Sequence, residues 1–107
     1  MRKQVVRAVS YKRHGRLTPR RSPGLRAGAV VLGVGEMIDW HSTRGRQELL
    51  IALAGRIQVE LSPSARRRRR VRLRAGECAM LPPQTAHRVV NQSSTKAHYL
   101  YVTASIT

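Results

Sequence analysis

Two histidines and one glutamate are the residues of this sequence whose types could together hold a metal ion. His41 ends one apolar stretch, Glu48 opens the next, and His87 follows the pair Pro82-Pro83. Two imidazoles and one carboxylate form a ligand set that binds a divalent metal and leaves coordination positions open. Because the three residues are far apart along the chain, they can meet only if a sheet curls upon itself. The sequence therefore predicts chemistry at a divalent metal ion, but it does not identify a substrate.

The elements that would position these residues are short strands that begin near Gly28. In 57–61 and 71–75, apolar residues alternate with polar ones, which is typical of strands with one buried face. Runs of this kind at close spacing, without a long amphipathic helix, predict an antiparallel sandwich or barrel. The expected strands are 29–34, 37–41, 48–54, 57–61, 71–75, 78–81, 87–91 and 98–104.

The run 48–54 is apolar on both faces. If Glu48 points into the barrel, Leu50 and Ala52 follow it inward, because strand residues alternate between faces. The outward residues are then Leu49, Ile51 and Leu53. An exposed apolar stripe needs cover, and a second copy of the chain is the simplest cover. We therefore expect a homodimer.

Positive charge dominates the sequence, with 21 Lys and Arg against 5 Asp and Glu. We expect a basic N-terminal arm over 1–27, in which 4–10 could form an edge strand and His14 is solvated. A single domain is expected over 28–107. Within it, the five arginines of 66–70 are expected to cap a hairpin loop. A field of this sign attracts acidic ligands and polyanions.

The stretches 35–55 and 76–91 resemble the paired motifs of the cupin superfamily. The first motif spaces a glycine, a histidine, a glutamate and a glycine; the second spaces a glycine, a proline, a histidine and an asparagine. The matching positions are Gly35, His41, Glu48, Gly55, Gly76, Pro82, His87 and Asn91. The resemblance covers residues 28–104. It implies an all-β fold, a small antiparallel jelly-roll β-barrel of the RmlC-like type.

Two positions depart from the family's pattern. Thr43 stands where the family usually has a second histidine, which removes one of four usual metal ligands. Gln84 stands where the second motif usually has glycine, and we expect this to alter only a turn. The resemblance then implies His41, Glu48 and His87 as ligands of a divalent Fe, Zn, Ni or Mn ion. One alternative stays open, in which the carboxylate pairs with Arg44, Arg46 or Arg88.

The resemblance implies a metal-dependent enzyme of the dioxygenase or isomerase type that acts on a small organic molecule. We expect Thr43, Met80, Tyr99 and Tyr101 to line the mouth of the barrel, where such molecules bind. The loss of a histidine at Thr43 motivates an alternative, a non-catalytic module that binds or senses a small ligand. Nucleic-acid binding is disfavoured, because no aromatic residues are interleaved with the arginines to stack on bases.

The sequence gives an expectation about location as well. No apolar run approaches the roughly 18 residues that a membrane span needs, and no apolar core of a signal peptide follows the basic N-terminus. Cys78 is the only cysteine, so nothing favours an oxidising compartment, and we interpret it as a small buried apolar residue. We expect a cytoplasmic protein.

Overall fold

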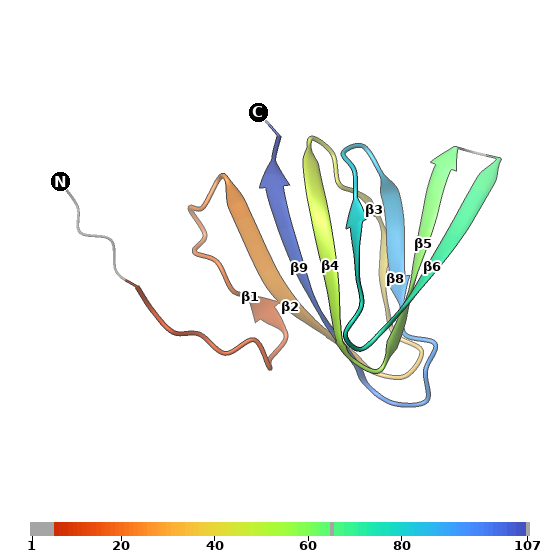
Figure 1. Cartoon of the computed structure of the whole chain (residues 1–107), viewed down its shortest axis with the longest axis horizontal. Coiled ribbons are helices and arrows are strands. Elements are labelled where there is room, and N and C mark those ends of the chain that lie inside the picture. Colours follow the sequence, from red (N-terminus) through yellow and green to blue (C-terminus); the bar gives the residue numbers. More distant parts are fainter. Residues whose placement is uncertain (1–5, 65, 107) are drawn as a thin grey trace.

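Period-two alternation builds two antiparallel sheets in this protein. The structure, a computed structural model, describes residues 6–64 and 66–106. One sheet has the strand order β1-β2-β9-β4-β7, and the other has the order β3-β8-β5-β6 (Figure 1). The strands are β1 (Gly15–Arg16), β2 (Leu25–Leu32), β3 (Met37–Ser42), β4 (Arg46–Ala54), β5 (Arg56–Ser64), β6 (Arg67–Arg74), β7 (Cys78–Leu81), β8 (Ala86–Val90) and β9 (Ala97–Ser105). The expected all-β jelly roll is confirmed, and a basic arm precedes it.

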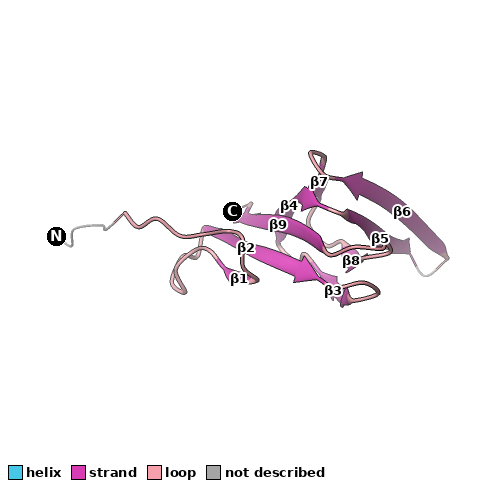
Figure 2. Cartoon of the chain, turned by 90° about the horizontal axis from the view of Figure 1, so that it is seen from below, coloured by secondary structure: helices cyan, strands magenta, loops and turns pink. Residues whose placement is uncertain are grey.

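The core lies between the two sheets (Figure 2). Leu50 and Ala52 of β4 face Ile57 and Val59 of β5, and all four are at most 2% exposed. Burial of each of the three larger side chains, those of Leu50, Ile57 and Val59, contributes about 1.5–3 kcal/mol. The remaining buried apolar residues are Ala29, Val30, Leu32, Leu73, Leu81, Val89, Ala97 and Tyr99. Leu50 and Ala52 point into the core, as the alternation predicts, and Glu48 lies on the same inner face of β4.

Two expectations about local structure are wrong. Strand β6 starts at Arg67, so most of the arginine run extends the β5–β6 hairpin as paired strand instead of forming its loop. The reason is that a two-stranded extension pairs its backbone while its guanidinium groups stay in water. In the arm, residues 6–10 form no strand, residues 4 and 5 lie outside the described part, and the expected loop is interrupted by β1.

Strand β7 also corrects the expectation for Cys78. This cysteine is exposed rather than buried, because its pairing with Ile51 puts it on the outer face of a strand at the sheet edge. Among the described residues, no helix is long and apolar enough to cross a membrane.

Candidate metal centre

The fold brings His41, Glu48 and His87 together, as the sequence predicted. One nitrogen or oxygen of each residue lies within 4.8 Å of those of the other two. His41 and His87 are opposite each other on β3 and β8, with ring centroids 4.2 Å apart, and Glu48 approaches from β4 in the other sheet. A register shift between Ile38 and His41 precedes this pair, and such bulges re-aim side chains.

Backbone carbonyl groups fix both imidazoles in the same way. Nδ1 of His41 lies 2.7 Å from the carbonyl oxygen of Asp39, and Nδ1 of His87 lies 3.1 Å from that of Thr85. A carbonyl oxygen can only accept, so each Nδ1 carries the proton and donates it. Nε2 of each ring is then the nitrogen left to bind a metal ion. This is the arrangement found around metal-binding histidines, whose other nitrogen is held by a second group.

The Nε2 atom of His87 has no hydrogen-bond partner among the described residues, although its side chain is completely buried. It faces Oε2 of Glu48 at 3.4 Å, and that side chain is 12% exposed. Burial lowers the pKa of His87, but the Glu48 carboxylate and the Thr85 carbonyl outweigh burial, so the pKa is raised above its usual value. Two acceptors that face each other across this distance need a cation between them, either a proton or a metal ion. The N, N, O set fits a divalent transition metal.

Arginine pairing, the alternative for Glu48, does not occur among the residues that the structure describes. Arg88 lies 2.9 Å from Glu60, and this hydrogen bond holds the pKa of Glu60 below its usual value. Arg46 donates to Thr103 and to backbone carbonyl groups. His87 is the only ion-pair neighbour of Glu48 within the described part of the chain.

Thr43 supports the turn before His87 instead of providing a free ligand. Its hydroxyl group donates to the carbonyl oxygen of Pro82 at 2.8 Å and accepts the backbone N–H of Thr85 at 3.0 Å. The residue is 6% exposed. Because the hydroxyl proton is committed to Pro82, Thr43 ties the end of β3 to the segment that carries His87.

The turn around Gln84 keeps the left-handed backbone that a glycine would adopt easily. Gln84 has a φ of 58° and Arg44 has a φ of 53°. The backbone N–H of Gln84 donates to the carbonyl oxygen of Arg44 at 2.7 Å. In these linked turns, Arg44 and Gln84 adopt a left-handed backbone conformation that residues other than glycine rarely adopt. Such strained backbone is common beside functional sites.

A cavity of about 580 Å³ opens over the three residues. Thr43, Tyr99 and Tyr101 line it, and Met80 does not. Met80 is 62% exposed, because its pairing with Leu49 turns it to the outer face of the sheet. Burial raises the pKa of Tyr99, and the nearby Glu48 and Tyr101 raise it further, so this phenol stays protonated.

The cavity wall also contains residues that the sequence interpretation missed. His14 is exposed, as expected, but it also lines the cavity, and its Nδ1 accepts the backbone N–H of Val31. Arg16 and Arg26 line the same wall. Alternation extended backwards from Val30 through β2 would have turned Arg26 inward, but the expected strand began at residue 29, four residues after the start of β2. Arg16 and His14 carried no comparable signal.

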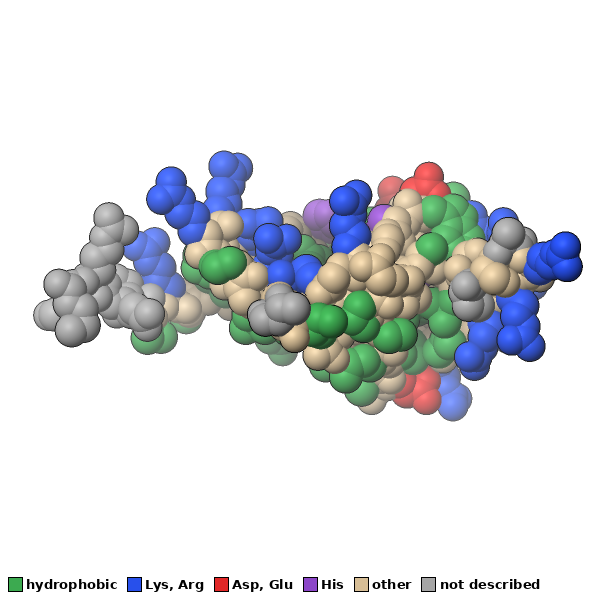
Figure 3. Space-filling model, turned by 90° about the horizontal axis from the view of Figure 1, so that it is seen from above, with side chains coloured by type: hydrophobic (Ala, Val, Ile, Leu, Met, Phe, Trp, Pro, Cys, Tyr) green, Lys and Arg blue, Asp and Glu red, His purple; other side chains and the backbone are tan. Residues whose placement is uncertain are grey.

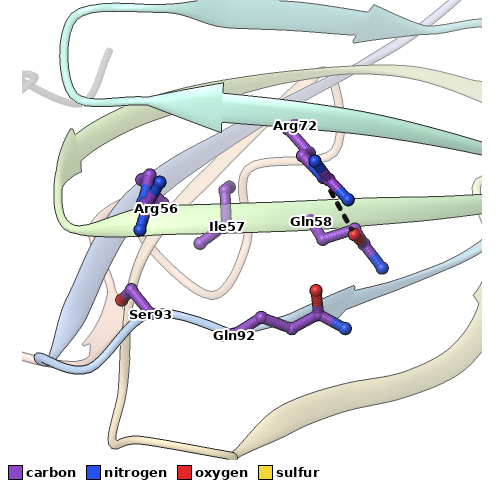
Figure 4. Close-up of a pocket in the computed structure, with 6 residues that line it drawn as sticks. All are labelled: Arg56, Ile57, Gln58, Arg72, Gln92 and Ser93. Carbon is purple, nitrogen blue, oxygen red and sulfur yellow. Dashed lines mark hydrogen bonds between the residues drawn. The ribbon is translucent and has the colours of Figure 1, made fainter.

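A second hollow, of about 210 Å³, lies beside strands β5 and β6 (Figure 4). Its lining residues are Arg56, Ile57, Gln58, Arg72, Gln92 and Ser93. Nε of Arg72 donates to Oε1 of Gln58 at 3.4 Å. None of these lining residues is a histidine, cysteine or carboxylate, so the hollow does not offer a metal site.

Comparison with known proteins gives a consistent picture of the fold. A family model described as a cupin domain matches residues 28–103. None of the curated protein sequences matches the chain. A solved structure of a "Cupin 2 conserved barrel domain protein" from Salinispora arenicola CNS-205 is 20% identical, with a TM-score of 0.73 over 98% of this chain and 92% of that one.

Other similar structures are longer than this chain. The cupin domain of Schizosaccharomyces pombe Cnp3 is 16% identical with a TM-score of 0.73, over 86% of this chain and 59% of that one. An oxalate oxidase is 21% identical with a TM-score of 0.68, over 77% of this chain and 42% of that one. The chain thus spans less than two thirds of these two proteins, and likeness at this identity shows the fold.

Proposed function

This chain belongs to the cupin domain family, and on that premise we propose that it binds a divalent metal ion and acts as an enzyme on a small organic molecule. The ligands in this proposal are His41, Glu48 and His87. One observation carries it: the buried Nε2 of His87 lacks a hydrogen bond while facing a carboxylate oxygen at 3.4 Å. A bound cation would satisfy both atoms. The oxalate oxidase among the similar structures supports the enzymatic part, since an enzyme exists on this fold.

The cavity over the three candidate ligands has room for a small molecule beside a bound ion. A divalent ion bound there would supply a Lewis acid for isomerisation or, as iron, a centre that activates dioxygen for oxygenation. The chain's own residues would bind and orient the substrate. Tyr101 offers a phenol on the cavity wall, and Tyr99 offers a protonated one because its pKa is raised. The buried ring of His87 closes the inner end of the cavity.

Metal content tests the proposal directly. Protein purified without chelator and then offered Fe(II), Mn(II), Ni(II) or Zn(II) is expected to hold about one ion per chain. Because an ion that binds only the folded state stabilises it, a metal concentration 100 times the dissociation constant is expected to add about 2.7 kcal/mol to the free energy of unfolding. Elemental analysis and thermal unfolding measure the two quantities. Less than about 0.2 ion per chain with every metal would contradict the proposal.

Thr43 favours a second candidate function, a non-catalytic cupin that binds a small ligand. Its hydroxyl group is engaged by Pro82 and Thr85, so it does not replace the missing fourth ligand. The metal analysis separates the two candidates, since a binding module of this kind does not need an ion.

A second copy of the chain is our proposed partner, and the outer face of the five-stranded sheet is its docking surface. The apolar outward residues of β2, β9, β4 and β7 are Ala27, Val31, Leu49, Ile51, Leu53, Cys78, Met80, Leu100 and Val102, and His98 lies on the same face opposite Val31. This set contains no Lys, Arg, Asp or Glu, in a chain with 21 Lys and Arg. Two such faces can approach without burying an unpaired guanidinium group, which would be costly.

Analytical ultracentrifugation is expected to find a dimer of the unchanged chain. Leu49→Lys places a charge in the middle of this face and is expected to shift the mass to that of a monomer. Met37→Lys is the matched control, because Met37 is 47% exposed on β3 of the other sheet. A monomer at every concentration, or a Leu49→Lys variant that remains a dimer, would exclude this interface.

A further inference from the structure

We infer that the cavity contains a second subsite, which binds the carboxylate or phosphate group of a small organic anion. Arg16, Arg26 and Arg44 form it, beside the candidate metal centre. The inference rests on the proposed function only for the other end of the ligand, which would lie near His41 and Glu48. The substrate class is then an organic acid or a phosphate ester.

The sheet register places an arginine and the metal-binding glutamate in one row. Arg26 on β2 is paired with Thr103 on β9, and Thr103 is paired with Glu48 on β4. All three line the cavity. Neighbouring strands lie about 4.8 Å apart, so the backbones of Arg26 and Glu48 are separated by roughly 10 Å. A small molecule with an acidic group at one end fits between an arginine and the metal centre.

The adjacent row adds a second arginine and a phenol. Arg16 on β1 is paired with Gly28 on β2, and Gly28 is paired with Tyr101 on β9. A Cβ atom at Gly28 would collide with the hydroxyl group of Tyr101, so the absence of a side chain lets this phenol lie over β2. The Tyr101 hydroxyl group therefore reaches the side of the cavity where Arg16 and Arg26 lie, and it can donate to the same anion.

Arg46 differs from the other cavity arginines because its guanidinium group is already engaged. Nε donates to Oγ1 of Thr103 at 2.9 Å, Nη1 donates to the Pro23 carbonyl at 3.0 Å, and Nη2 donates to the carbonyl groups of Thr103 and Gly24. These bonds hold the segment just before β2. Arg46 is thus a positioning residue for Arg26, which follows Gly24 by two positions.

The guanidinium groups of Arg16, Arg26 and Arg44 make no hydrogen bond or ion pair with residues that the structure describes. Four arginines and one glutamate line the cavity, and that glutamate faces His87. A concave wall with an excess of one sign focuses the field and raises the local concentration of the opposite ion. Histidine side chains also lie beside Lys or Arg side chains on the face shown in Figure 3. Free guanidinium groups bind carboxylate and phosphate through paired, charge-assisted hydrogen bonds.

Titration calorimetry on metal-free protein tests the subsite independently of the metal. Succinate and inorganic phosphate are the probes, and they distinguish a preference for carboxylate from one for phosphate. The double variant Arg26→Gln, Arg44→Gln is expected to bind the preferred probe at least about tenfold more weakly, because each removes charge-assisted hydrogen bonds. Arg74→Gln is the control. This substitution removes one positive charge, as each substitution of the double variant does. Arg74 lies on β6, outside the cavity.

The outcomes separate this inference from the proposed function. His98→Ala in metal-free protein is expected to retain anion affinity within about twofold, because His98 lies outside the cavity. The subsite stands and the metal proposal fails if the unchanged protein takes up no metal but binds the anion, and if only the double variant loses that anion binding. Absence of binding to both probes, or equal weakening by Arg74→Gln, would overturn the subsite while leaving the metal proposal intact.

Discussion

Replacing His87 with alanine is expected to lower the affinity for a divalent ion by more than about 100-fold, with the protein still folded. Changing groups that merely support metal ligands already costs about 10–100-fold, and His87 would be a ligand itself. The cavity left by the imidazole destabilises the fold by about 2–3 kcal/mol. The variant also removes a buried lone pair that faces a carboxylate, which offsets part of this cost.

Competition with a chelator of known affinity measures the change, and circular dichroism confirms folding. Glu48→Ala is expected to give the same loss of metal binding. His98→Ala is the matched control. His98 lies outside the cavity, and its Nε2 is 2.7 Å from the carbonyl oxygen of Tyr11. Full metal occupancy in either His87→Ala or Glu48→Ala would remove that residue from the ligand set.

Replacing Asn91 with alanine is expected to lower the free energy of unfolding by about 3 kcal/mol or more. Asn91 is completely buried. Its Nδ2 donates to the carbonyl groups of Leu32, Gly33 and Thr95, and its Oδ1 accepts from the backbone and hydroxyl groups of Ser93. Alanine would leave these groups without partners, and water cannot replace them freely in a buried site.

Chemical denaturation of two further variants checks the physical reason. Asn91→Asp keeps the acceptor for Ser93 but loses the donor, and it is expected to be destabilised as well, because a carboxylate would then face the carbonyl oxygens of Leu32 and Thr95. Gln92→Ala, the exposed neighbour, is expected to change stability by less than about 0.5 kcal/mol. Equal stability of Asn91→Ala and Gln92→Ala would contradict this role.

Several parts of the fold and the site could be predicted from the sequence because they depend on local patterns. Alternation of apolar and polar residues predicts the strands, and it correctly turned Leu50 and Ala52 inward with Glu48. The spacing of the two motifs predicted that His41, Glu48 and His87 meet. Each of these inferences uses only the period of a strand and the order of the turns.

The errors fall where neighbours across the sheet decide the outcome. Met80 and Cys78 were expected inside or buried, yet their partners on β4 turn both to the outer face. From the sequence, no residue of the arm was assigned to the site. In the structure the arm contributes His14 and Arg16 to the cavity wall through pairing of β1 with β2.

The sequence alone determined the class of fold and the three candidate ligands, because strand period and motif spacing are properties of the chain itself. Only the tertiary structure decided that Thr43 ties down a turn, and that, within the described part of the chain, Glu48 has no guanidinium partner and unpaired arginines share its cavity. The physical reason is that hydrogen-bond partners and net charge in a cavity depend on which strands become neighbours. Register between strands distant in the chain sets those neighbours, and no local pattern encodes it.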